Sequence, residues 1–231
     1  SAASDVYKRQ VPKGVTGEDS AAFMKVYVDR WVRKQLKLKE AETLFSASGD
    51  DIDKGRVNSN KTVARLLWDG MQSYELRLSY FDGGNLRNAI PREAYAIFGV
   101  PTRLRDEFRK RYELFAADMH AEFRLCEPNF RITLNEMPAV DHVIDEKTQF
   151  GLVYSLVGVP NGVVAMSMAL PGLVETSTNL ASVKFVDGAK IVVTSSQRSS
   201  VESAKTYVMQ MVESVFALAG ADVAHLSLIH I

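Results

Sequence analysis

The sequence has little with which to build a disulfide or a metal centre. Its 231 residues contain one cysteine, Cys126, which excludes an internal disulfide framework and removes thiolate clusters. The four histidines are scattered, without the His-x-x-x-His or His-x-Asp spacing of common zinc sites. No general-base pair, nucleophile triad or phosphate-binding loop is visible. We therefore expect no catalytic residue and no metal ligand in this chain.

The charge and hydropathy of the chain exclude two further classes of partner. Lys and Arg total 28 and Asp and Glu also total 28, so no net field attracts nucleic acid or anionic lipid. No apolar run approaches the roughly 20 residues that a membrane-spanning helix needs. The N-terminal region also lacks the apolar stretch of a signal peptide. The expectation is a protein that binds neither nucleic acid nor membrane.

Hydrophobic periodicity predicts the order of the elements. Helices are expected over 20–44, 58–70, 102–125, 145–157 and 199–220. Strands are expected over 74–81, 92–100, 131–137, 162–170, 180–187 and 190–197, the last two joined by a tight Asp187-Gly188 turn. Ser199 and Glu202 have the spacing of a capping box for the last helix, and Gly220 marks its end.

Two faces of these helices can be assigned in advance. In 102–125 the apolar stripe is Leu104, Phe108, Tyr112, Phe115, Met119 and Phe123, typical of a buried face. For the last helix the expected buried face is Val201, Ala204, Val208, Met211, Val215 and Ala219. The basic residues of 20–44 suit a membrane-surface or RNA-binding helix, but a solvated helix face is the interpretation adopted.

The order of elements indicates the fold class. From residue 72 onward, strand pairs alternate with amphipathic helices. This order predicts an α+β fold, a two-layer antiparallel sheet with helices on one face, preceded by an N-terminal α-helix.

Three polar segments beside strands are candidate binding sites. In "GGNLRNAIPRE" (83–93), the Ile90-Pro91 step fixes an extended path that aims Asn88 outward, although a glycine turn with a local Asn hydrogen bond is the alternative. In "PGLVETSTNLASVK" (171–184), Thr178 and Asn179 stand at the expected mouth of a strand, where such side chains also cap their own loop.

The third candidate is Arg198, where a strand meets the last helix. A guanidinium there suits a bound carboxylate, and an ion pair with Glu202 is the alternative. Taken alone, the residues indicate a binding module and nothing catalytic.

Four segments, in this order, resemble a known family. They are "SGDDIDKGRVNSNK" (48–61), "GGNLRNAIPREA" (83–94), "MALPGLVETSTNLA" (168–181) and "QRSSVESAK" (197–205). Through them residues 48–221 resemble the aminoacyl-histidine dipeptidases, also called cytosolic non-specific dipeptidases, which are zinc exopeptidases. The resemblance implies the lid or dimerisation domain of such an enzyme, which closes over the dipeptide substrate.

The resemblance also implies roles for the candidate residues. Asn88 would contact the substrate or the tetrahedral intermediate, and Arg198 would clamp the C-terminal carboxylate. Thr178 and Asn179 would line the same mouth, and a homodimer would form through the lid. The family's zinc ligands and catalytic glutamate lie in a separate domain, outside the match. The chain is thus expected to be a cytoplasmic enzyme fragment that binds no zinc itself and is inactive alone.

The chain departs from the family pattern at Ala47. The family has Gly-Gly-His before Ser-Gly-Asp-Asp, and its histidine is thought to help stabilise the oxyanion, but here "FSA" (45–47) takes that place. Ala47 has no side-chain donor with which to do so.

The N-terminal part resembles something else. Residues 11–54 are similar to the leading helix of bacterial periplasmic peptidyl-prolyl isomerase and chaperone proteins. The predicted organisation is a foreign helical segment over 1–47, the dipeptidase lid over 48–225, and an artefactual tail over 226–231. The alternative function is a non-enzymatic chaperone or isomerase-like interaction module that acts through the N-terminal helix.

Overall fold

The computed structural model of the chain describes residues 36–39, by their backbone, and residues 57–226. Most of the predicted N-terminal helix over 20–44 lies outside the described residues. Within it, Leu36–Lys39 form strand β1, so the helix prediction is wrong there. The sequence "LKLK" alternates with period two, and its backbone pairs with two other strands, which overrides the helical pattern around it.

The described strands form one seven-stranded sheet in which every pairing is antiparallel. Its order is β4 (Arg131–Thr133), β1, β3 (Glu93–Gly99), β2 (Arg77–Gly83), β6 (Val174–Val186) and β5 (Gly162–Met166), with β7 (Lys190–Ser199) on β6. Since β7 pairs with β6 along most of its length, β5 and β2 share the opposite edge of β6.

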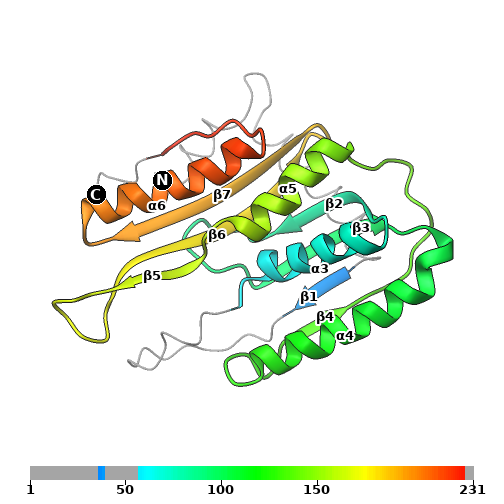
Figure 1. The fold of residues 1–231 in the computed structure, drawn as a ribbon, viewed down its shortest axis with the longest axis horizontal. Helices are drawn as coiled ribbons and strands as arrows, with labels where there is room; N and C mark the ends of the chain where they lie inside the picture. The colour runs from blue at the N-terminus through cyan, green and yellow to red at the C-terminus, as the bar shows by residue number, and fades with distance from the viewer. Residues whose placement is uncertain (1–35, 40–56, 227–231) are drawn as a thin grey trace.

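Four helices of the described part lie in front of this sheet in the view of Figure 1. They are α3 (Ser59–Ser73), α4 (Arg105–Phe123), α5 (Glu146–Gly158) and α6 (Glu202–Leu218); a 3-10 turn, Thr102–Leu104, precedes α4. The predicted α+β class, an antiparallel sheet with helices on one face, is confirmed.

The core lies between the helices and the sheet. On α3, Val63, Leu66 and Leu67 are fully buried. On α4, four members of the predicted stripe are buried, namely Phe108, Phe115, Met119 and Phe123. Each such side chain contributes about 1.5–3 kcal/mol when it leaves water, so the stripe is enough to fix which face of α4 meets the sheet.

Two predictions about the C-terminal region are wrong. Strand β6 begins at Val174, not at residue 180, so Thr176–Asn179 lie inside the strand instead of at its mouth. The capping box does not form, because β7 continues through Ser199 and α6 begins only at Glu202. The Ser199 hydroxyl instead accepts a hydrogen bond from the Val201 backbone N–H at 3.0 Å.

The buried face of α6 also differs from the prediction. Its buried residues are Val208, Val212 and Phe216, of which only Val208 was in the predicted set. The later start of the helix and its packing against the sheet select a neighbouring stripe. By contrast, the Asp187-Gly188 turn is confirmed, with φ of 54° and 64°, and Gly220 ends the helix with φ of 79°.

Candidate functional site

The β6–β7 ribbon has two chemically different faces. Side chains alternate along β6, and Thr176 and Thr178 are buried, 1% and 3% exposed, on the side covered by helices. Ser177 and Asn179 therefore lie on the other side, the open face. Directly paired residues of neighbouring strands share a face, so Arg198, opposite Ser177, and Ser196, opposite Asn179, are on the open face too.

The helix-covered face holds a chain of short polar side chains. The Thr178 hydroxyl accepts from Gln197 Nε2 at 3.3 Å and lies 3.5 Å from the Ser195 hydroxyl. Thr176 and Ser199 are joined in the same way, with 2.8 Å between their hydroxyl oxygens. The Thr178 side chain thus lies on the opposite face of the sheet from those of Asn179 and Arg198. It does not line one common site with them.

The open face carries the loop that contains Asn88. Asn179 Nδ2 donates to the carbonyl of Ala89 at 2.7 Å, which places residues 84–91 beside β6. Gly84 has φ of 72°, and a Cβ there would lie 1.9 Å from the Ala181 carbonyl oxygen, so this close approach needs glycine. Asn88, next to the anchored Ala89, is exposed to solvent.

Arg198 is exposed on the open face of β7. It does not pair with Glu202, because that carboxylate binds Lys205 Nζ at 2.6 Å. Within the described residues the Arg198 guanidinium forms no ion pair. The alternative prediction, an ion pair between Arg198 and Glu202, is therefore wrong. The Arg198 guanidinium is available to bind an external anion.

The sheet geometry brings Asn179 and Arg198 to the same face. Asn179 is opposite Ser196, and Arg198 is two residues further along β7 on the same face. Diagonal neighbours of this kind lie about 7–8 Å apart. The loop that bears Asn88 is bonded to Asn179 through the Ala89 carbonyl.

A second cation on the open face is already neutralised. Lys184 Nζ lies 2.7 Å from Asp82 Oδ1 and donates to Asn85 Oδ1 at 2.9 Å. Burial raises the pKa of Asp82, and the charge of Lys184 opposes this shift. This pair anchors the start of the Asn88 loop to β6.

Sequence reasoning missed the residues that hold this arrangement together. Asn58 caps α3, and its side-chain Nδ2 also donates to Asn161 Oδ1 and to the Leu180 carbonyl, both at 2.9 Å. A polar residue before an apolar helix signals the cap. Nothing in the sequence signals contacts to residues more than 100 positions away.

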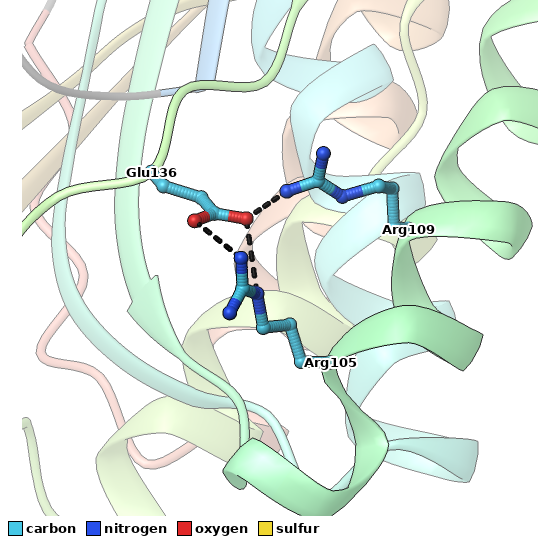
Figure 2. A network of polar contacts seen from close by, with 3 residues as sticks. All are labelled: Arg105, Arg109 and Glu136. Carbon is cyan, nitrogen blue, oxygen red and sulfur yellow. Dashed lines mark hydrogen bonds and ion pairs between the residues drawn. The ribbon is translucent and has the colours of Figure 1, made fainter.

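A cavity of about 550 Å³ forms a separate candidate near the start of α4. At its rim, Arg105 and Arg109 both bind Glu136, as Figure 2 shows, with Arg105 Nη2 at 2.9 Å from Glu136 Oε2. All three side chains are about half exposed, so each pair contributes no more than about 1 kcal/mol. Because one carboxylate already occupies both guanidinium groups, this cavity is the weaker candidate for an anionic ligand.

Neither a metal centre nor a membrane span is found in residues 57–226. No group of three or more His, Cys, Asp or Glu side chains there is arranged to hold a metal ion. Among the described helices, none is both long and apolar enough to cross a membrane.

Comparison with known proteins places the chain in a family. No protein-family model matches the chain. It is 33% identical over 174 residues to the cytosol non-specific dipeptidase of Escherichia coli (strain K12). The match covers 75% of this chain and 36% of that protein. The crystal structure of aminoacylhistidine dipeptidase from Vibrio alginolyticus superposes with a TM-score of 0.74 at 33% identity, over 82% of this chain and 38% of that one.

The resemblance to the aminoacyl-histidine dipeptidase family is confirmed. The chain spans little more than a third of the length of either dipeptidase, so it corresponds to a segment of such a protein. The domain boundaries stay predictions. One observation bears on these boundaries: β1, which lies in the segment expected to be foreign, pairs with β3 and β4 inside the sheet.

Proposed function

We propose that this chain is the lid of a zinc-dependent dipeptidase and orients the dipeptide on its open sheet face. Two observations support the proposal: both relatives are dipeptidases, and the chain matches little more than a third of the length of each. The described residues do not fit a zinc site. Zinc and the catalytic groups would then belong to the rest of the parent enzyme.

The observation that carries the proposal is the guanidinium of Arg198, which has no ion-pair partner among the described residues and lies on the face where Asn179 holds the Asn88 loop. A guanidinium binds a carboxylate through two parallel hydrogen bonds, which fixes the orientation of the ligand as well as its position. Two extended residues span about 7 Å. This length matches the diagonal spacing of about 7–8 Å between Arg198 and Asn179, where the loop is attached.

Each residue then has a defined task. Arg198 would hold the C-terminal carboxylate of the dipeptide at one end. Asn88 would donate its side-chain amide to the peptide carbonyl or to the intermediate that forms from it. Holding the peptide in one orientation lowers the entropy that must be lost in the reaction, which is how a lid contributes to rate without catalytic groups of its own.

Titration of the intact chain with alanyl-alanine tests the binding role. We expect the Arg198 Nε and Asn88 amide NMR signals to shift with alanyl-alanine and not with alanyl-alanine amide, which lacks the carboxylate. Arg198→Gln should abolish both shifts, whereas Ser196→Ala, on the same face of β7, should preserve them. Equal responses to the acid and the amide would exclude the carboxylate clamp.

The same substitution in an intact relative tests catalysis. Replacing the matching arginine of the Escherichia coli dipeptidase with glutamine should lower kcat/KM about 100-fold, because charged hydrogen bonds of this kind contribute about 1.5–3 kcal/mol. An unchanged kcat/KM would show that the arginine does not hold the substrate.

The homodimer is proposed on a different observation. Strand β7 pairs only with β6 among the described strands, so its outer edge presents free backbone groups over Lys190–Ser199. Such an edge without proline is suited to pair with a second copy. Light scattering should give twice the 25.7 kDa mass of one chain, and a monomer at all concentrations would contradict the proposal.

We also propose a cytoplasmic location, since the Escherichia coli relative is named a cytosol dipeptidase. The alternative chaperone-like function rests on a helix that lies outside the described residues, except at 36–39, which form a strand. Suppression of client aggregation by this chain without metal would favour that alternative over a lid.

A further inference from the structure

We infer that Asn179 is a positioning residue that fixes the Asn88 loop and does not itself bind the peptide. The inference rests on the proposed function for the importance of Asn88. The hydrogen-bond network that supports it can be tested without any ligand.

The network starts at Asn58, which is 2% exposed. Its Oδ1 accepts from the backbone N–H groups of Asn60 at 3.1 Å and Lys61 at 3.3 Å, which caps α3. Its Nδ2 donates to Asn161 Oδ1 and to the Leu180 carbonyl. Both ends of this amide are used, so Asn58 is held in one orientation between α3, the start of β5 and β6.

Asn179 is oriented mainly by the loop. Its amino group donates to the Ala89 carbonyl at 2.7 Å, which turns its Oδ1 the other way, toward Asn58 Nδ2. That oxygen lies 3.4 Å from Asn58 Nδ2, a weak third contact, because both hydrogens of the Asn58 amide already donate to Asn161 and Leu180. The oxygen of the Asn179 amide is thus directed at Asn58, and its nitrogen is directed at the loop.

The loop is held at points on either side of Asn88. After Asn88, the Ala89 carbonyl binds Asn179, and the Pro91 carbonyl accepts from the Ser59 backbone N–H at 3.2 Å. Before it, Asn85 binds Lys184. The Asn179 bond is made one residue from Asn88, so its loss should change where that side chain is presented.

The substitution Asn179→Asp isolates this bond. It keeps the shape and the oxygen that faces Asn58, but it replaces the donor with an oxygen that repels the Ala89 carbonyl. Asn179→Ala removes both groups. The matched control is Ser177→Ala, which is two residues away on the same strand and the same face.

Hydrogen exchange measured by mass spectrometry on the intact chain is the first readout. We expect residues 84–90 to exchange about tenfold faster in both Asn179 variants, as loss of one such bond predicts, with β7 unchanged. Ser177→Ala should match the wild type. Unchanged loop exchange would overturn the inference, and so would an equal acceleration throughout β6 and β7, which indicates general loosening of the sheet.

Titration with alanyl-alanine then separates positioning from direct binding. If Asn179 positions the loop, Asn179→Ala should keep the Arg198 Nε shift and lose the Asn88 amide shift. If Asn179 is itself a ligand, both shifts should weaken together, and the inference is wrong. A wild-type chain with no Arg198 response would refute the proposed function instead, while the exchange result would still decide the role of Asn179.

Discussion

Gly83 is a position where an added methyl group should destabilise the core beside the site. It is the buried last residue of β2, paired with Ala94 on one side and Val183 on the other. A Cβ there would lie 1.8 Å from Asn60 Oδ1 and 2.9 Å from Ala94 Cβ. Both distances are below normal carbon contacts, so Gly83→Ala requires α3 or β3 to move.

The expected cost follows from how little room these neighbours have. Asn60 is fully buried, and Ala94 is 0% exposed inside the sheet. Overpacking of a core costs about 1–3 kcal/mol, and contact with two elements at once places Gly83→Ala near the upper end, about 2–3 kcal/mol. With a urea m-value of about 2–3 kcal/mol/M, the unfolding midpoint should fall by roughly 1 M.

A control and a rescue make this prediction specific. At Gly99, the last residue of β3, an added Cβ meets nothing within 4 Å, so Gly99→Ala should leave the midpoint nearly unchanged. The Asn60 side chain has no hydrogen-bond partner in the described part of the chain, so Asn60→Ala removes the clashing oxygen without breaking a bond. In the double variant with Gly83→Ala, about 1–2 kcal/mol should be recovered. A Gly83→Ala midpoint equal to that of Gly99→Ala, or no coupling with Asn60, would refute the reasoning.

Two further predictions concern charged side chains. Burial lowers the pKa of Lys61 to about 8, so between pH 8 and 10 the unfolded chain binds more protons than the folded one. The unfolding free energy should therefore rise with pH, by less than about 1.4 kcal/mol per pH unit. Lys61→Met should remove this slope in urea titrations. Lys184→Met should cost about 2–3 kcal/mol at pH 7, because it leaves the partly buried Asp82 carboxylate without its cation. Adding Asp82→Asn should restore much of that loss, and an equally unstable double variant would contradict the explanation.

Local patterns were sufficient wherever an element is decided by its own residues. The stripe on α4 repeats Phe108, Phe115, Met119 and Phe123 at helical spacing, and all four are buried. The Asp187-Gly188 turn follows from two residues that tolerate positive φ. In both cases the pattern of residue types lies within a short stretch of the chain, so the sequence is enough to predict the element.

Local patterns failed where pairing with a distant strand decides the outcome. Leu36–Lys39 form a strand because β3 and β4 provide backbone partners on both sides. Ser199 belongs to β7 and not to a helix cap because it pairs with Thr176, and β6 begins early because β5 and β7 flank it. Hydrogen bonds to a neighbouring strand outweigh the small propensity differences that a sequence displays.

By itself the sequence determined that the chain is an α+β domain, that it resembles the dipeptidases, and that Asn88 and Arg198 are the residues to test. Only the tertiary structure decided which candidates share a surface. One-residue alternation along β6 sends Thr178 beneath the helices and Asn179 to the open face, and strand pairing brings Arg198 to that same face. The hydrogen bonds of the Asn58 side chain join α3 to β6 and to the segment before β5, across more than 100 residues. Such contacts arise from the packing of elements against one another, which no local run of residues specifies.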